Sequence, residues 1–378
     1  MKRKFSFFYI ILLLAFVIPV SCGGGGAFSS DEGEEIPLRY AELLKMRQCE
    51  GYVYVQVLNP WDSTSVLHSY VLIDKDAPEP EGRPKGDLIR VPVENSVVYS
   101  LVHCALIDEI GAYSQIKGVC DLRYITMDKV QADVRNGKIR NLGEGLNPNI
   151  EDVIDMSPDA ILLSPFQNSG GYGRLGKLGI PLVECADYME TSAMGRAEWI
   201  RFFGMLYGKQ TECDSIFEEV CSRYESLKNL AATAKIRPSV ITDLKYGSTW
   251  YVPGGKSTTG KLLADAGGDY IYKDNEDNGS LALAPEVVFE RAIDADVWMI
   301  RYTQAVSKTY GEIAQEYANY ARMKAFANRN IYSCNTELVP FYSEVPFHPD
   351  RLLQDFIKIL HPDLLPDYEL NYYERITK

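Results

Sequence analysis

The sequence predicts an α/β protein of two lobes, each a mainly parallel sheet with flanking helices, joined by a long rigid backbone helix and preceded by an N-terminal β-hairpin extension. Two observations lead to this prediction. Segments with helical spacing alternate with short apolar strand patterns in both halves of the chain, which is typical of parallel sheets. Between the halves, residues 192–235 have helical spacing and contain no proline-rich linker. A chain of 378 residues is long enough for two medium domains.

The N-terminus has the pattern of a secretory signal. A basic start precedes an almost wholly apolar run over residues 5–20, and Ser21 and Cys22 follow it. At roughly 1.5 Å per residue, this run is short for a membrane-spanning helix. The segment resembles the signal of a bacterial lipoprotein, in which such a cysteine is acylated. We therefore expect a lipoprotein signal peptide at 1–22, lipidation of Cys22 and a flexible polar tether at 23–35. An uncleaved signal anchor is the alternative.

Residues 36–88 are expected to form the β-hairpin extension and a connector. Residues 51–60 and 65–73 alternate aliphatic and other side chains with a period of two, as half-buried strands do. The letters NPWD stand at their junction and are typical of a turn. Residues 74–84 are rich in proline and charge, which favours an irregular connector.

Residues 89–191 are assigned to the N-terminal lobe. We expect a short strand at 89–93 and a helix at 97–112. The run 149–166 has the pattern of a helix, a Ser-Pro break and a buried strand, and 175–185 that of a helix end followed by another strand. Strands that are separated by helices in this way pair in parallel.

The bridging helix is expected within 192–235, and residues 236–378 form the C-terminal lobe. This lobe repeats the alternation of the first. Its expected elements are a strand and turn at 239–247, a helix and strand at 259–272, a helix and strand at 284–302, a last strand at 329–335 and a closing helix at 348–362.

The net charge of −13 and the pI near 4.9 argue against nucleic acid as a partner, because an acidic surface repels phosphate backbones. The chain contains 25 tyrosines, whose flat apolar face and polar tip suit a surface that lines a ligand. Seven cysteines follow Cys22; their number is odd, and no pair has the C-x-x-C spacing of metal ligands. We therefore predict neither a disulfide framework, nor a metal site, nor a cofactor.

Four segments in order carry a resemblance to a known family: 145–164 (GLNPNIEDVIDMSPDAILLS), 175–184 (LGKLGIPLVE), 255–272 (GKSTTGKLLADAGGDYIY) and 283–300 (LAPEVVFERAIDADVWMI). The chain resembles the class III periplasmic substrate-binding proteins, which serve ABC importers of cobalamin, iron-siderophores and haem. The resemblance runs from about residue 91 to the C-terminus. The extension departs from compact members of the family, and either adds a wall to the pocket or covers a sheet edge.

The resemblance implies partners as well as a ligand. In this family, each lobe carries an exposed glutamate that meets an arginine of the permease, and Glu151 and Glu286 stand at the matching positions. Both follow a turn and fall in the first turn of a helix, where the helix dipole also favours a carboxylate. We expect an ABC permease and its ATPase as partners, a membrane contact through the lipid anchor, a monomeric state and a location on the periplasmic side of the bacterial envelope.

Ligands of open α/β sheets bind beyond the carboxyl ends of the strands, here facing the space between the lobes. Nearly every predicted strand end is followed by an aromatic residue, and three are followed by a cation. Aromatic faces suit large or planar ligands, and arginine suits carboxylates on them, so an organic metal chelate is the expected ligand. The candidate ligand-binding residues are Tyr99, Phe166, Gln167, Tyr172, Lys245, Tyr246, Trp250, Tyr251, Arg301, Tyr302, Phe341, Tyr342, His348 and Arg351.

Six of these candidates are singled out. Tyr246, Trp250, Tyr251, Arg301 and Tyr302 form the principal expected set. His348, at the start of the closing helix, is either an axial ligand for haem iron or cobalt, or a residue that only forms a hydrogen bond or caps the helix.

The stretch Gly255-Lys256-Ser257 looks like the end of a phosphate-binding P-loop, but Trp250 stands where such a loop needs its first glycine. We expect a turn in which Ser257 or Thr258 caps a helix and Lys256 faces solvent.

Other catalytic motifs, such as H-E-x-x-H or G-x-S-x-G, are absent from the sequence, so we do not expect an enzyme. The rival hypotheses are a chelatase-like enzyme and a lipoprotein that captures chelates at the surface without a permease.

Overall fold

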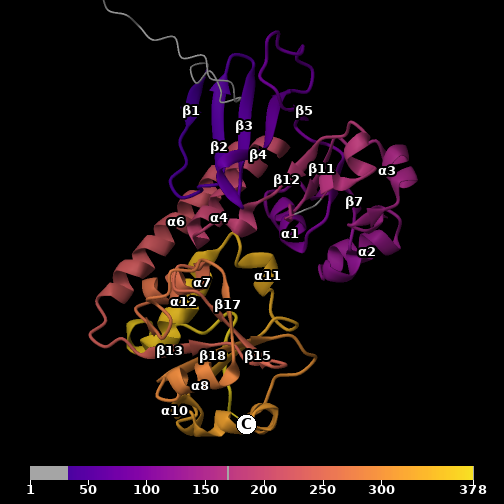
Figure 1. Cartoon of the computed structure of the whole chain (residues 1–378). Coiled ribbons are helices and arrows are strands. Elements are labelled where there is room, and N and C mark those ends of the chain that lie inside the picture. The colour runs from indigo at the N-terminus through magenta and orange to yellow at the C-terminus, as the bar shows by residue number, and fades with distance from the viewer. Residues whose placement is uncertain (1–32, 168–169, 378) are drawn as a thin grey trace, which may run out of the picture.

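The computed structural model describes residues 33–167 and 170–377, and the chain forms three regions (Figure 1). An N-terminal sheet and the N-terminal lobe lie next to each other, and the C-terminal lobe lies on the far side of a bridge of helices. The predicted signal peptide, the lipidation site Cys22 and most of the tether fall outside the described residues.

The N-terminal sheet has five strands in the order β1-β2-β3-β4-β5. The expected hairpin is its centre, because β3 and β4 pair antiparallel with Val53 opposite Leu72. The bounds are β1 (Glu34–Ile36), β2 (Leu44–Cys49), β3 (Tyr52–Asn59), β4 (Asp62–Asp74) and β5 (Asp87–Val91).

The assignment of the strand at 89–93 to the N-terminal lobe is wrong. This segment is β5, which pairs in parallel with β4, with Leu72 opposite Ile89. The proline-rich connector returns the chain to the same edge of β4, and Ile89 is fully buried there. Side-chain periodicity identified the strand, but it could not show that the strand pairs with β4. Pairing depends on where the connector between the two strands returns the chain.

The sheet of the N-terminal lobe is parallel, with the order β12-β11-β6-β7-β8. The helix expected at 97–112 is shorter, because its first residues form β6 and the side chain of Ser100 caps the helix at the amide of Val102. The bounds are β6 (Ser96–Val98), α1 (Leu101–Glu109), β7 (Ile116–Val119), α2 (Asp128–Arg135), β8 (Arg140–Asn141), β9 (Gly143–Glu144), β10 (Asn147–Pro148), α3 (Ile150–Met156), β11 (Ala160–Leu163) and β12 (Leu182–Glu184).

The bridge consists of α4 (Ala193–Glu198), α5 (Ile200–Tyr207) and α6 (Gln210–Ala232). Gly208 ends α5 with a φ of 65°, a left-handed conformation that glycine adopts without steric cost. The 23 residues of α6 pack against α5 on one side and against α12 of the C-terminal lobe on the other. The bridge between the two lobes is therefore a set of three helices, of which α6 is the longest.

The C-terminal lobe has a sheet of order β16-β13-β18-β19-β20, parallel except for β20, and a small antiparallel sheet β14-β15-β17. The closing helix α12 follows the expected range. The bounds are β13 (Ser239–Thr242), β14 (Lys245–Tyr246), β15 (Thr249–Pro253), α7 (Thr258–Asp265), β16 (Asp269–Tyr270), β17 (Ser280–Leu283), α8 (Pro285–Ala292), β18 (Val297–Tyr302), α9 (Tyr310–Glu316), α10 (Lys324–Ala327), β19 (Ile331–Asn335), α11 (Phe341–Glu344), α12 (Pro349–Leu360) and β20 (Glu374–Arg375).

Short 3-10 helices complete the connections. They are η1 (Tyr113–Gln115), η2 (Leu122–Tyr124), η3 (Gly170–Tyr172), η4 (Leu175–Lys177), η5 (Asp187–Met189), η6 (Ala318–Arg322) and η7 (Pro362–Leu364).

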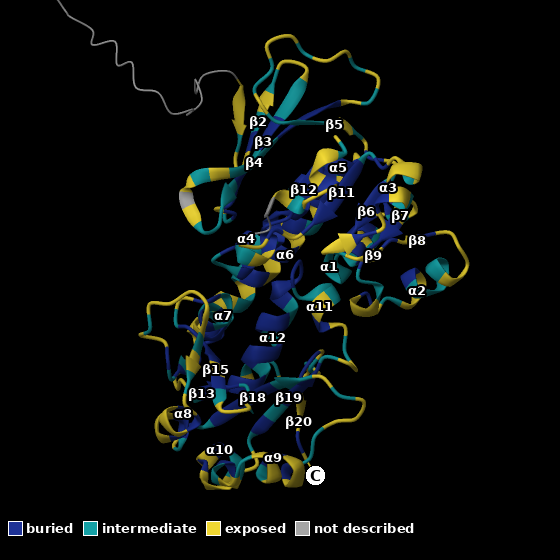
Figure 2. Cartoon of the chain, turned by 45° about the vertical axis from the view of Figure 1, so that its right-hand side comes forward, coloured by how far each residue is buried: buried dark blue, intermediate teal, exposed yellow. Residues whose placement is uncertain are grey.

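The central strands and α12 are buried, and the polar loops lie outside (Figure 2). A single apolar cluster extends from the N-terminal sheet through the bridge into the C-terminal lobe. The edge of Phe203 in α5 meets the ring of Phe347, just before α12, at 6.1 Å between centroids. This shared core holds the carboxyl ends of the two parallel sheets in a defined relation, because tightly packed interiors resist deformation.

Candidate functional site

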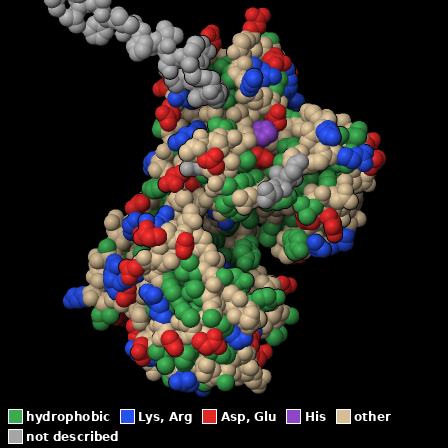
Figure 3. Space-filling model, viewed as in Figure 1, with side chains coloured by type: hydrophobic (Ala, Val, Ile, Leu, Met, Phe, Trp, Pro, Cys, Tyr) green, Lys and Arg blue, Asp and Glu red, His purple; other side chains and the backbone are tan. Residues whose placement is uncertain are grey.

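Each lobe carries a cavity at the carboxyl ends of its parallel strands. The cavity of the C-terminal lobe has a volume of about 740 Å³ and that of the N-terminal lobe about 1030 Å³. The surface is hollowed between the two lobes, and hydrophobic side chains gather there (Figure 3). These positions agree with the rule that open α/β sheets bind ligands beyond the carboxyl ends of their strands.

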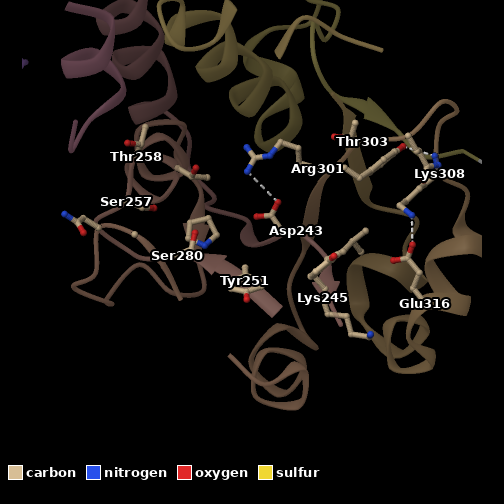
Figure 4. Close-up of a pocket in the computed structure, with 18 residues that line it drawn as sticks. Asp243, Lys245, Tyr251, Ser257, Thr258, Ser280, Arg301, Thr303, Lys308 and Glu316 are labelled. Carbon is tan, nitrogen blue, oxygen red and sulfur yellow. Dashed lines mark hydrogen bonds and ion pairs between the residues drawn. The ribbon is translucent and has the colours of Figure 1, made fainter. Parts of the chain in front are cut away.

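The C-terminal cavity is built where β13 and β18 end. Asp243 follows β13 with a φ of 60°, which turns the chain sharply into β14. Arg301 and Tyr302 are the last residues of β18, and Arg301 points towards Asp243 at 4.0 Å (Figure 4). The small sheet adds Tyr251 from β15.

Asp243 and Arg301 form a charged pair in this cavity. Burial raises the pKa of the Asp243 carboxyl, and Arg301 partly opposes this rise. Burial alone would lower the pKa of Arg301, but Asp243 raises it above its usual value, so the guanidinium stays charged. The ring of Phe341 lies 5.2 Å from the guanidinium carbon, a distance that allows a cation–π contact.

Two lysines line the same cavity. Lys308 pairs with Glu316, and its backbone amide donates to the hydroxyl of Tyr302 at 2.7 Å. Lys245 donates to the carbonyl of Gly247 at 3.1 Å. The cavity therefore contains three cationic and two anionic side chains, in a protein whose net charge is −13.

The start of α7 forms another wall. Ser257 caps the helix by accepting from the amide of Gly260 at 3.1 Å, as expected. Lys256 points to solvent and pairs with Glu276. A side chain at Gly255 would meet the carbonyl of Asn275 at 2.4 Å, so this glycine serves close backbone packing rather than phosphate binding.

The N-terminal cavity lies beyond β6 and β11. Of the predicted residues, Tyr99, Phe166 and Tyr172 line it. Leu146 also lines it and is 84% exposed, so an apolar side chain is accessible to a ligand there. A side chain at Gly145 would come within 2.6 Å of Asp121, so the chain can pass close to this wall only with glycine.

The structure thus separates candidate residues that line a cavity from candidates that line neither. Lys245, Tyr246, Tyr251, Arg301 and Tyr302 meet in the C-terminal cavity. The remaining candidates line neither of these two cavities: Gln167, Trp250, Phe341, Tyr342, His348 and Arg351.

Trp250 was expected to contact the ligand, and this expectation is wrong. Its side chain is fully buried, and the indole N–H donates to the carbonyl of Thr242 at 3.2 Å. It packs against Trp298 and Tyr320, at 6.0 and 5.3 Å between ring centroids. Residues alternate between the two faces of a strand, so β15 directs Trp250 into the core and Tyr251 outwards.

Phe341 is also buried and lies behind Arg301, so it supports the guanidinium instead of lining the cavity. Tyr342 is half-exposed beside it, with ring centroids 5.4 Å apart. Gln167 is exposed. Arg351 pairs with Glu344 at 2.9 Å in a third hollow of about 410 Å³.

His348 is buried, and its Nε2 lies 2.7 Å from Oε1 of Glu109 in α1. The histidine thus forms a hydrogen bond between the lobes, which is the second of its two expected roles. Its place outside both cavities contradicts a role as an axial metal ligand in them.

The two glutamates matched to permease docking are both exposed and lie in the first turns of α3 and α8. Glu151 also lines the rim of the N-terminal cavity, where Arg174 lies 3.5 Å away. Glu286 lines neither cavity.

Sequence reasoning missed several lining residues. Thr303 and Gln304 directly follow the end of β18, and the others come from connections between elements: Asp121, Leu146, Arg174, Asn278 and Lys308. For the N-terminal set, the glycines at 143 and 145 were an available signal, because they lie in the connection between β8 and α3 and such connections often carry binding residues.

Within residues 33–167 and 170–377, no group of three or more His, Cys, Asp or Glu side chains could hold a metal ion. No helix in the described part of the chain is long and apolar enough to cross a membrane.

Comparisons with known proteins agree with this architecture. Residues 111–338 match the model of the periplasmic binding protein family. An uncharacterized lipoprotein of Methanocaldococcus jannaschii is 29% identical over 320 residues, which cover 80% of this chain and 75% of that protein.

Two solved structures share the fold. A possible iron-binding, periplasmic solute-binding protein of Staphylococcus epidermidis aligns with a TM-score of 0.57 at 18% identity, covering 71% of this chain and 99% of that one. A periplasmic haem-binding protein of Pseudomonas aeruginosa aligns with a TM-score of 0.58 at 11% identity, covering 76% and 99% of the two chains. Because the family match spans more than half of the sequence, this chain belongs to the periplasmic binding protein family.

Proposed function

We propose that this protein captures an organic metal chelate with anionic groups between its two lobes and delivers it to an ABC importer. The observation that carries the proposal is the C-terminal cavity, where Arg301, Lys245 and Lys308 lie among tyrosines. Arginine and lysine bind carboxylates and other oxyanions, and aromatic faces bind the flat or bulky body of a ligand. Ferric siderophores, haem and cobalamin are the chelates that we consider.

A chelate fits better than a bare metal ion. The described residues contain no cluster of metal-ligating side chains, so a bound ion would bring its own donor atoms. The exposed apolar side chains at the cavities, Leu146, Phe166, Tyr246 and Tyr251, would cover the organic part of such a ligand. The relatives named above are consistent with this class, because one is described as possibly iron-binding and one as haem-binding.

Delivery rests on the two exposed glutamates. Glu151 and Glu286 occupy the first turn of a helix in different lobes, so each lobe carries one of the two carboxylates. We propose that both meet basic residues of an ABC permease, which its ATPase drives. We further propose that lipidation at Cys22 holds a monomer on the periplasmic side of the envelope.

A binding screen tests the proposal. The purified protein is titrated with haemin, cyanocobalamin, a ferric tris-catecholate and a ferric tris-hydroxamate, and tryptophan fluorescence is followed. We expect saturable binding of one class at micromolar or lower dissociation constant. Binding of none of them, together with binding of a bare metal ion, would overturn the chelate proposal.

The same samples distinguish binding from catalysis. Metal content and the absorption spectrum of the ligand are measured before and after incubation. We expect both to stay unchanged, because the protein releases the chelate intact. Insertion or removal of the metal would favour the chelatase-like alternative.

A further inference from the structure

The N-terminal sheet reaches a residue of the N-terminal cavity through a short chain of contacts. The hydroxyl of Tyr172, which lines that cavity, donates to Oε1 of Glu184 at 2.7 Å. Glu184 ends β12, and its side chain is only 7% exposed. Its other oxygen, Oε2, lies 3.5 Å from Nδ1 of His68 in β4.

His68 is held in place from two further sides. Its Nε2 lies 3.0 Å from Oδ2 of Asp87 in β5, and its ring stacks on Tyr70 at 4.8 Å with an interplanar angle of 11°. The hydroxyl of Tyr70 donates to the carbonyl of Leu182 at 2.9 Å and accepts from the amide of Glu184 at 2.8 Å. The N-terminal sheet therefore contacts both the backbone and the side chain of Glu184, the last residue of β12.

The buried carboxylate of Glu184 is stabilised electrostatically by His68. Among the described residues, Oε2 of Glu184 accepts no hydrogen bond, and it is buried. A buried carboxylate without a compensating partner is costly, so the cation of His68 is its main electrostatic support on that side. The groups that face His68 are Asp87 of β5 and Glu184 of β12, and both favour its protonated form.

The backbone of Tyr172 has an unusual conformation. It adopts a φ of 61° between Gly171 at 72° and Gly173 at 57°. A left-handed conformation is unfavourable for a tyrosine, so tertiary contacts must hold it. The hydrogen bond to Glu184 is such a contact.

We propose that the N-terminal sheet positions the wall of the N-terminal cavity through His68, Glu184 and Tyr172, so that His68 and Glu184 are positioning residues for the ligand. This role rests on the proposed function of the cavity. It gives the extension a task in ligand binding, although no residue of the extension lines either cavity.

The first test uses the free protein and needs no ligand. Hydrogen exchange of the amides at residues 171–175 is measured at neutral pH in the wild type, His68→Gln, His68→Lys and Lys45→Gln. Lys45 is an exposed cation on β2 and serves as the matched control. We expect about 3- to 30-fold faster exchange in His68→Gln, near wild-type exchange in His68→Lys, which keeps a cation facing Glu184, and no change in Lys45→Gln. Unchanged exchange in His68→Gln would overturn the proposal.

The second test measures binding of the chelate that the screen identifies. We expect His68→Gln and Tyr172→Phe each to weaken binding about 3- to 30-fold, and the double variant to lose no more than the larger single effect, since both act through Glu184. Fully additive losses would overturn the positioning role. If no chelate binds the wild type, the proposed function fails, while the exchange experiment still decides the positioning role.

Discussion

His348 and Glu109 join the two lobes: Nε2 of the histidine lies 2.7 Å from Oε1 of the glutamate, across 239 positions of sequence. The histidine is buried at the start of α12, and the glutamate ends α1. We expect His348→Ala to lower the free energy of unfolding by about 1–3 kcal/mol, because a charge-assisted hydrogen bond is lost. Chemical denaturation measures this loss.

The same variant tests the metal-ligand role. We expect the absorption spectrum of bound haemin or cobalamin to be the same in His348→Ala and in the wild type. A changed metal coordination band would contradict the structural role that the hydrogen bond to Glu109 assigns to His348.

Arg301 is expected to contribute most to affinity for an anionic ligand. Replacement by glutamine should weaken binding about 10- to 100-fold, as loss of a charge-assisted hydrogen bond does. Lys256→Gln is the control, because Lys256 is a nearby cation that points to solvent. Titration calorimetry at low and high salt checks the result. Equal losses of affinity in both variants would show that binding depends only on the net charge of the protein, and not on Arg301.

Trp250 and Tyr251 are neighbours on β15 with opposite roles. We expect Trp250→Ala to cost about 3–5 kcal/mol of stability, because it leaves a cavity in the core. Tyr251→Ala should cost far less stability and weaken ligand binding several-fold, since this ring faces the cavity. Thermal unfolding and ligand titration of both variants separate the two effects. A stable Trp250→Ala protein that fails to bind would reverse the assignment.

Glu286 gives the cleaner test of permease docking, because Glu151 also lines the rim of a cavity. We expect Glu286→Lys to reduce uptake in cells strongly and to leave ligand affinity unchanged. Glu290→Lys, an exposed position one turn further along α8, is the matched control. Uptake is followed with labelled chelate. Lost affinity in Glu286→Lys would assign this glutamate to the ligand site.

The free energy of unfolding should decrease at alkaline pH, because His68 loses its proton there. Burial alone would lower the pKa of His68, but the hydrogen bond to Asp87 and the nearby carboxylate of Glu184 outweigh it and raise this pKa from 6.5 to about 9. A raised folded-state pKa adds stability that is complete below pH 6.5 and is lost as the pH rises through 9. Because Asp87 is half-exposed, we expect a loss of only about 1–2 kcal/mol. Urea unfolding of the wild type and His68→Gln between pH 6 and 10 measures it; an equally steep decline in both would exclude His68 as the cause.

Local patterns predicted much of the fold. The cap at Ser257, the hairpin of β3 and β4 and the helix-then-strand segments over 149–166 and 284–302 follow from side-chain periodicity and capping residues, which act over a few positions. The position of Arg301 at the carboxyl end of a buried strand also followed from this pattern.

Other features required the three-dimensional structure. Periodicity cannot say which face of β15 meets the core, so Trp250 was placed on the wrong side. Lys308 and Arg174 reach the cavities from loops, whose course depends on packing against distant elements.

The sequence by itself determined an α/β protein of two lobes with an acidic surface, a bridging helix and strand ends rich in tyrosine, because these properties depend on composition and short-range spacing. Only the tertiary structure decided which strand ends share a cavity, that His348 joins the lobes and that the N-terminal sheet contacts Glu184. Such relations arise from contacts between residues that are far apart in the sequence, and short-range patterns carry no record of them.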